Sequence, residues 1–300
     1  MRLGATSLSV TRPGSVRKYT AAGGGGASNT NFDDISNYSH VRFDQINTGS
    51  LAVVGIEFNN TGTTMWTVDT GSSSLKYLRQ QTLSTAWDIS TAGSQTAQLN
   101  LVAGNPSDFS NPREVRIKPD GFMLWVCDFY SVIREYTLTT AFDLAGGISN
   151  TGSKTMGGRL GGFVWKPDGT ALFTIDYSTD KIKKYEFATA WDIESTVTST
   201  TESPLLSLST TANEGNAQSL AFSPDGLKVY FAGTSGDKIY MYNLGTAWDI
   251  TSSSLSGTPD DTLSVSSQET NPLVITFSSD GKHLYVGGSQ GDGVDQYSRP

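Results

Sequence analysis

The sequence predicts an all-β fold, and three observations support this prediction. Only 36% of the 300 residues are hydrophobic and 17% are charged, whereas glycine alone contributes 32 residues. Together with abundant Ser, Thr and Asn, this composition is typical of many short strands joined by turns. No long window shows the 3.6-residue spacing of apolar side chains that marks a helix. The third observation is a unit that recurs about every 50 residues, a period typical of repeat folds.

Two phrases recur in step along the chain. The first, Thr-Ala-Trp-Asp-Ile or a close variant, sets an aromatic residue before an aspartate, at Trp87 and Asp88, Phe142 and Asp143, Trp191 and Asp192, and Trp248 and Asp249. The second, Pro-Asp-Gly or a variant of it, ends in a glycine at Gly121, Gly169, Gly226 and Gly281, with a degenerate copy that ends at Gly62. Such self-similarity indicates propeller blades or a solenoid.

Each repeat contains the pattern of four short strands. In the fourth repeat the expected strands are 219–222, 228–232, 238–244 and 262–266, with a Pro-Asp-Gly turn between the first two. The glycine of that turn stands where a positive φ is expected. Because four antiparallel strands per repeat make a blade, the sequence predicts a β-propeller of about five four-stranded blades.

The two ends of the repeat series are complementary. The fifth repeat has expected strands at 274–277, 283–286 and 294–297, and the chain ends before an outer strand. A strand-like segment at 40–46 precedes the first inner strand, and residues 41–58 match residues 205–222 without a gap. We therefore predict that this N-terminal strand completes blade five and closes the ring, which removes an exposed sheet edge. The propeller would span residues 39–300, after a Gly/Ser-rich arm at residues 1–38.

The repeated aromatic and aspartate residues are interpreted as structural. A large flat side chain at a fixed blade position is expected to be mostly buried between neighbouring blades, and the adjacent aspartate to hydrogen-bond a local turn. Each Asp-Gly turn offers one carboxylate, which is too few oxygens for calcium. We therefore expect no cofactor, no metal site and no catalytic residue.

Three motifs that resemble catalytic sites have simpler explanations. Asp69 begins an Asp-Thr-Gly-Ser run like that of aspartic proteases, but that chemistry needs a second such loop, and Asp69 lies seven residues after Gly62 as an ordinary repeat position. Cys127 is the single cysteine and is expected to be a buried apolar residue. The two histidines, His40 and His283, are too few for a zinc site.

The repeat resembles propeller modules with a Ser-Pro-Asp-Gly … Thr-Ala-Trp-Asp-Ile pattern that occur in bacterial and bacteriophage proteins. It is distantly similar to YVTN, NHL and WD-type propellers. The resemblance covers about residues 41–300 and implies the fold. Propellers host hydrolases, lectins and scaffolds alike, so the fold does not by itself assign a function.

The expected function is that of a non-enzymatic virion protein of the tail, fibre or capsid-decoration type. Its partners would be other virion proteins, reached through the N-terminal arm, and a host surface glycan or protein. A net charge of −8 argues against nucleic acid, and no apolar run is long enough to span a membrane. Met1–Ser7 lacks the apolar run of a secretory signal. The alternatives are a carbohydrate- or protein-binding propeller on a bacterial cell surface, and a propeller lactonase or lyase.

Overall fold

The computed structural model divides the chain into two units. Met1–Thr30 is one unit, which lies outside the described residues, and Asn31–Pro300 is the other. Within the second unit the structure describes residues 34–44, 52–71, 75–102, 110–204, 206, 216–234, 236–290 and 293–300.

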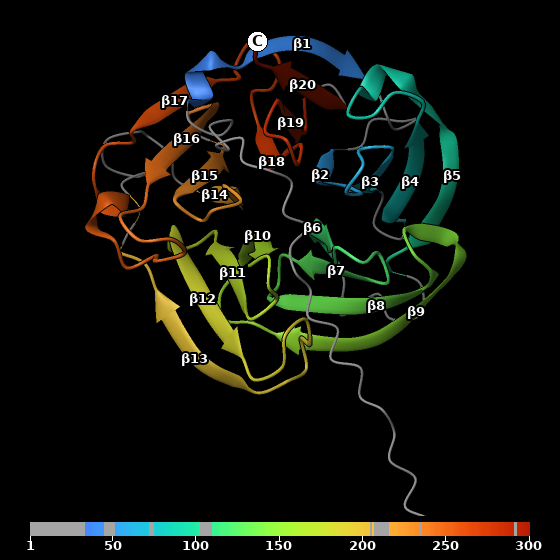
Figure 1. Ribbon diagram of the computed structural model, residues 1–300, viewed down its shortest axis with the longest axis horizontal. Coiled ribbons are helices and arrows are strands. Elements are labelled where there is room, and N and C mark those ends of the chain that lie inside the picture. The colour runs from blue at the N-terminus through green and yellow to red at the C-terminus, as the bar shows by residue number, and fades with distance from the viewer. Residues whose placement is uncertain are drawn as a thin grey trace, which may run out of the picture. The chain divides into compact units, whose positions relative to one another are not determined.

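Five sheets of four antiparallel strands form a ring around a central axis (Figure 1). From the centre outward, blade one contains β2 (Val53–Phe58), β3 (Thr64–Asp69), β4 (Tyr77–Leu83) and β5 (Ala92–Asn100). Blade two contains β6 (Pro112–Ile117), β7 (Met123–Asp128), β8 (Val132–Thr140) and β9 (Asp143–Thr155). Blade three contains β10 (Leu160–Trp165), β11 (Ala171–Asp176), β12 (Lys181–Phe187) and β13 (Val197–Glu202). Blade four contains β14 (Ala217–Phe222), β15 (Lys228–Gly233), β16 (Lys238–Asn243) and β17 (Asp261–Ser264).

Blade five joins the two ends of the propeller and confirms the predicted closure. Its sheet runs β18 (Pro272–Phe277), β19 (His283–Gly288), β20 (Val294–Ser298) and β1 (Ser39–Asp44) from the centre outward. Strand β1 pairs with β20 in antiparallel register, from Ser39 opposite Ser298 to Asp44 opposite Val294. The predicted strand extended to residue 46, and its last two residues lie outside the described ranges.

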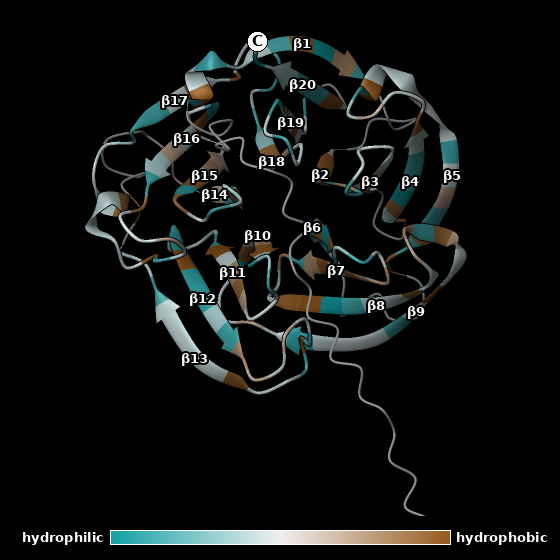
Figure 2. Cartoon of the chain, in the orientation of Figure 1, coloured by the Kyte–Doolittle hydropathy of each residue, from teal (hydrophilic) through white to brown (hydrophobic). Residues whose placement is uncertain are grey.

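The burial pattern explains why these segments form a ring of sheets. Almost every residue of the inner strands is buried, as in β14 and β18, because both faces of these strands meet other blades. The outer strands are mostly exposed, as in β13, and Figure 2 shows polar colouring along β17 and much of β9. Apolar area is therefore concentrated where blades face one another.

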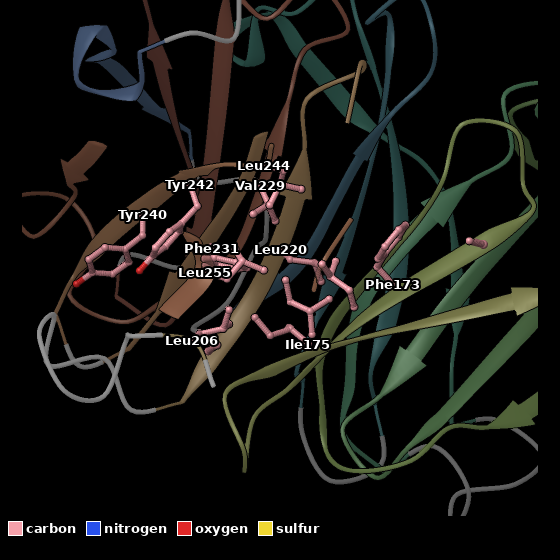
Figure 3. Packing of buried hydrophobic residues seen from close by; sticks show 14 residues of the cluster. Phe173, Ile175, Leu206, Leu220, Val229, Phe231, Tyr240, Tyr242, Leu244 and Leu255 are labelled. Carbon is pink, nitrogen blue, oxygen red and sulfur yellow. The ribbon is translucent and has the colours of Figure 1, made fainter. Parts of the chain in front are cut away.

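The interface between blades three and four shows this packing directly. Phe173 and Ile175 of β11 face Leu220, Val229 and Phe231 of blade four, and all five side chains are buried (Figure 3). Burial of side chains of this size stabilises a fold by about 2 kcal/mol each, so the blade interfaces are the main source of stability.

The start of the propeller differs from the predicted boundary. Residues 34–38, which the sequence analysis assigned to the arm, belong to the ring. Ile35 lies in the short 3-10 helix η2 (Ile35–Asn37), and both Ile35 and Tyr38 are buried in the cluster shared by blades four and five. Only these two apolar side chains stand in an otherwise polar segment, too few to show a pattern. The remainder of the predicted arm, residues 1–33, lies outside the described residues.

Candidate functional site

The repeated glycine and the repeated aromatic residue contact each other in each of blades one to four. The backbone N–H of the aromatic residue donates to the glycine carbonyl over 2.9–3.0 Å, in the pairs Trp87 and Gly62, Phe142 and Gly121, Trp191 and Gly169, and Trp248 and Gly226. The four glycines have φ between +68° and +79°. A Cβ atom added at Gly226 would lie 2.2 Å from the ring of Trp248. The two phrases recur in step because they form one structural unit.

The four aromatic side chains keep some exposure, but the larger part of each is buried, in agreement with the prediction. Each lies at the seam between its own blade and the preceding one. The ring of Trp248, for example, has its centroid 5.0 Å from that of Phe222 in blade four and 5.9 Å from that of Phe173 in blade three. The ring therefore packs on both blades and keeps a smaller exposed part, because it covers the outside of a turn.

The repeated aspartates form local turns. In each case Oδ1 accepts the backbone N–H two residues ahead, over 2.9–3.0 Å: Asp88 from Ser90, Asp143 from Ala145, Asp192 from Glu194 and Asp249 from Thr251. Hydrogen bonds from Thr251 also lower the pKa of Asp249. Each carboxylate thus forms its own turn, as such residues usually do, and Asp88 also accepts a hydrogen bond from Nη1 of Arg42 in β1.

The motifs that resemble catalytic sites occupy structural positions. Asp69 is the last residue of β3, fully buried, with Oδ2 2.7 Å from Nε of Arg79, and Asp128 and Asp176 end the equivalent strands β7 and β11. The thiol of Cys127 is buried, and burial raises its pKa, which keeps it protonated. Among the described residues, no group of three or more His, Cys, Asp or Glu side chains is placed to hold a metal ion. In the same residues, no helix is long and apolar enough to cross a membrane.

The inner ends of the blades contain polar residues that the repeat pattern did not reveal. The five inner strands have six residues each and align position by position. The fifth positions all line one cavity: Glu57, Arg116, Val164, Ala221 and Thr276. The third positions are Gly55, Glu114, Gly162, Ser219 and Val274. Charged side chains therefore enter the centre of the ring from blades one and two, and small or apolar ones from blades three and four.

A hydrogen-bonded cluster spans the centre of the ring at the third positions. Oγ of Ser219 in blade four donates to Oε2 of Glu114 in blade two over 3.0 Å, and accepts the backbone N–H of Ile275 in blade five over 3.2 Å. Gly162 of blade three makes room for this contact, because a Cβ there would lie 3.3 Å from Glu114 Oε2. The cluster connects three blades across the axis.

The charges in the cluster are strongly perturbed by burial. Nη1 of Arg116 lies 2.9 Å from Oε1 of Glu114 and 3.5 Å from Oε2 of Glu57. Burial raises the pKa of Glu114 to about 8 despite the opposing effect of Arg116, and burial also raises the pKa of Glu57. Glu114 is consequently mainly uncharged at pH 7, and Nη1 of Arg116 lies within 3.5 Å of both carboxyl groups. A raised pKa is also a property of acid–base catalysts. Here both oxygens of Glu114 are engaged by Arg116 and Ser219, which favours a structural role for this carboxyl group.

A cavity of about 280 Å³ lies on the central axis, at the end where the Pro-Asp-Gly turns meet. We call it the funnel. Glu57 and Arg116 are the next-to-last residues of β2 and β6. They therefore lie below the turns and form the polar floor of the funnel. Its walls are aromatic and proline side chains from the strand ends and turns: Trp165, Trp191, Phe222, Phe277, Pro119, Pro167 and Pro224. Nε1 of Trp165 is buried without a hydrogen-bond partner among the described residues. An apolar wall with a few polar groups is the usual construction of a small-molecule site.

One sequence signal could have revealed these central residues. The inner strands of blades three to five contain no charged residue, whereas β2 contains Glu57 and β6 contains Arg113, Glu114 and Arg116, so these charges depart from the repeat. Superposing the five inner-strand segments would have placed Glu57, Glu114 and Arg116 at axis-facing positions. Their mutual contacts could not have been predicted, since they depend on the diameter of the closed ring.

No protein-family model matches the sequence, and no curated protein matches it. Solved structures share the fold. The periplasmic gluconolactonase of Pseudomonas aeruginosa is 15% identical, over 78% of this chain and 65% of that chain, with a TM-score of 0.48. A putative 6-phosphogluconolactonase from Bacteroides uniformis is 14% identical, over 81% and 66%, with a TM-score of 0.47. A β-propeller domain from Myceliophteria thermophila is 11% identical, over 83% and 64%, with a TM-score of 0.45. The chain thus spans less than two thirds of each of these structures, and the similarity is one of fold alone.

Proposed function

We propose that this chain is a non-enzymatic structural or attachment protein of a virion, in which the propeller is the interaction module and residues 1–33 dock it to the particle. The observation that carries the proposal is the completeness of the ring from Asp34 onward. Strand β1 supplies the outer strand of blade five, and Tyr38 supplies an aromatic side chain that packs on that blade. Among the described residues, the ring closes through 34–44.

The composition of residues 1–33 supports a docking role. The segment contains four consecutive glycines and many Ser, Thr and Asn residues, so it cannot bury enough apolar surface to fold alone. Ordering such a segment costs more backbone entropy than ordering most sequences, and contacts with another protein would have to offset that cost. The resemblance of the repeat to bacteriophage propeller modules makes a virus particle the proposed partner.

The outer surface of the propeller supports an interaction role. The exposed outer strands β5 and β13 contain mainly Ser, Thr, Gln and Ala side chains, with Glu202 as the single charged residue among them. Uncharged hydroxyl and amide groups can be buried in a protein interface at less cost than charges, provided that they find hydrogen-bond partners.

The test is particle association. The full chain and a variant lacking residues 1–30 are expressed during virus production, and particles are purified on a density gradient. We expect the full chain in the particle fraction and the truncated chain, still folded, in the soluble fraction. Retention of the truncated chain on particles would contradict the docking role. Recovery of the full chain in the bacterial envelope, with none in particles, would favour the cell-surface alternative.

A further inference from the structure

We propose that the funnel is a binding site for one neutral sugar ring of a glycan. The described residues that line the funnel all lie between positions 57 and 279, and the inference does not rest on whether residues 1–33 bind a particle. The cavity of about 280 Å³ lies just below the usual range of small-molecule sites, which favours a single ring over a longer ligand segment.

The balance of charge at the floor selects a neutral ligand. Arg116 and Glu57 line the same cavity, with Nη1 and Oε2 3.5 Å apart. An anionic ligand near the guanidinium group would also meet the carboxylate, and a cationic ligand would meet the guanidinium group. A like charge at this distance in a partly buried site is strongly unfavourable. A neutral ligand avoids both repulsions.

The floor also has unused hydrogen-bonding capacity. In the described part of the chain, every hydrogen bond from the Arg116 side chain is made by Nη1, so Nη2 and Nε have no acceptor there. Oε1 of Glu57 accepts the backbone N–H of Phe58 over 3.0 Å, and each carboxylate oxygen can accept more than one hydrogen bond. Two neighbouring hydroxyl groups of a sugar, each both a donor and an acceptor, can form hydrogen bonds with Arg116 and Glu57 at the same time.

The aromatic walls of the funnel are suited to the apolar C–H face of a sugar ring. Trp165 and Trp191 lie side by side with ring centroids 5.5 Å apart, and Phe222 and Phe277 line the same cavity. The C–H face of a pyranose ring is apolar and can stack on such rings. A purely apolar occupant, such as a Phe or Leu side chain of a peptide, would bury Glu57 and Arg116 without giving them hydrogen-bond partners, which is unfavourable.

The experiment uses the full chain, fluorescently labelled, on a microarray of bacterial and animal glycans. The methyl glycoside of the terminal sugar of the best-bound glycan is then titrated by tryptophan fluorescence. We expect saturable binding that Glu57→Gln weakens about tenfold, because a charged acceptor is lost while the shape is kept.

Two matched variants separate the funnel from the rest of the propeller. Trp191 lines the funnel, whereas Trp248 occupies the equivalent repeat position in blade four outside it. Phe142 stands naturally at this position in blade two, so phenylalanine fits the fold. We expect Trp191→Phe to weaken binding several-fold, through the smaller stacking area, and Trp248→Phe to leave it unchanged. The proposal is overturned if no glycan binds, if binding survives both Glu57→Gln and Trp191→Phe, or if Phe- and Trp-containing peptides bind in place of glycans.

Discussion

The ring of Trp248 and the turn at Gly226 constrain each other's conformation. Gly226 has φ of +73°, and the residue that covers it has φ of +62°, a conformation that tryptophan rarely adopts. Strain of this kind costs on the order of 1–3 kcal/mol and persists only where the surroundings enforce it. The backbone hydrogen bond of 2.9 Å and the packing of the ring on the glycine provide that enforcement.

We expect Gly226→Ala to lower the free energy of unfolding by about 3 kcal/mol, because the new Cβ would strike the Trp248 ring and because alanine disfavours positive φ. The matched control is Gly245→Ala, three residues before Trp248, where an added Cβ would meet nothing within 4 Å. Urea denaturation of both variants measures the difference. Equal stabilities would show that the ring does not require glycine beneath it.

Glu114 gives the propeller a distinctive pH dependence. Its pKa is raised from 4.5 to about 8 in the folded protein. Between these values the folded state holds a proton that the unfolded state releases, so this group makes stability fall as the pH rises from about 4.5 to about 8. Glu114→Gln removes that contribution. We expect the variant to gain stability relative to the natural protein between pH 5 and pH 8, measured by urea denaturation at both values. A constant difference would mean that Glu114 is already ionised in the fold.

At the scale of elements, β1 and Tyr38 reproduce in blade five the contacts of the other blades. In blades one to four an aromatic residue from the repeat covers the turn glycine. In blade five the hydroxyl group of Tyr38 donates to the carbonyl of Gly281, and its ring lies 6.0 Å from that of Phe277. The contact between blade five and blade one also repeats a contact found between blades one and two. Gln296 accepts the backbone N–H of Ile89 over 3.2 Å, as Gln80 accepts that of Leu144 between blades one and two.

Tyr38 is therefore expected to hold strand β1 in place on blade five. Tyr38→Phe removes one hydrogen bond and should lower the free energy of unfolding by about 1 kcal/mol, whereas Tyr38→Ala also empties a buried site and should cost about 3–5 kcal/mol. Hydrogen exchange measures the effect locally, at the amides shared by β1 and β20. If these amides keep their protection in Tyr38→Ala, the side chain does not hold the strand.

At the scale of the whole molecule, the repeat made most of the architecture predictable. The spacing of the turn glycines indicated five blades, and the missing outer strand after residue 297 indicated where the N-terminal strand belongs. That residues 34–38 belong to the propeller was not predictable, because Ile35 and Tyr38 are isolated in a polar segment. The cluster of Glu114, Arg116 and Ser219 was not predictable either, since it joins residues from different blades that meet only in the closed ring.

The central claim is that the propeller is complete from Asp34 to the C-terminus and depends on its N-terminal strand for closure. Thermal unfolding of two truncated chains tests it, one that begins at residue 31 and one that begins at residue 45. We expect the first to unfold cooperatively with Tm within about 2 °C of the full chain, because no described contact is lost. The second lacks Tyr38 and β1, exposes the edge of β20, and should aggregate or lose its cooperative transition. Equal melting of the two truncated chains, or unfolding of the first, would contradict the claim.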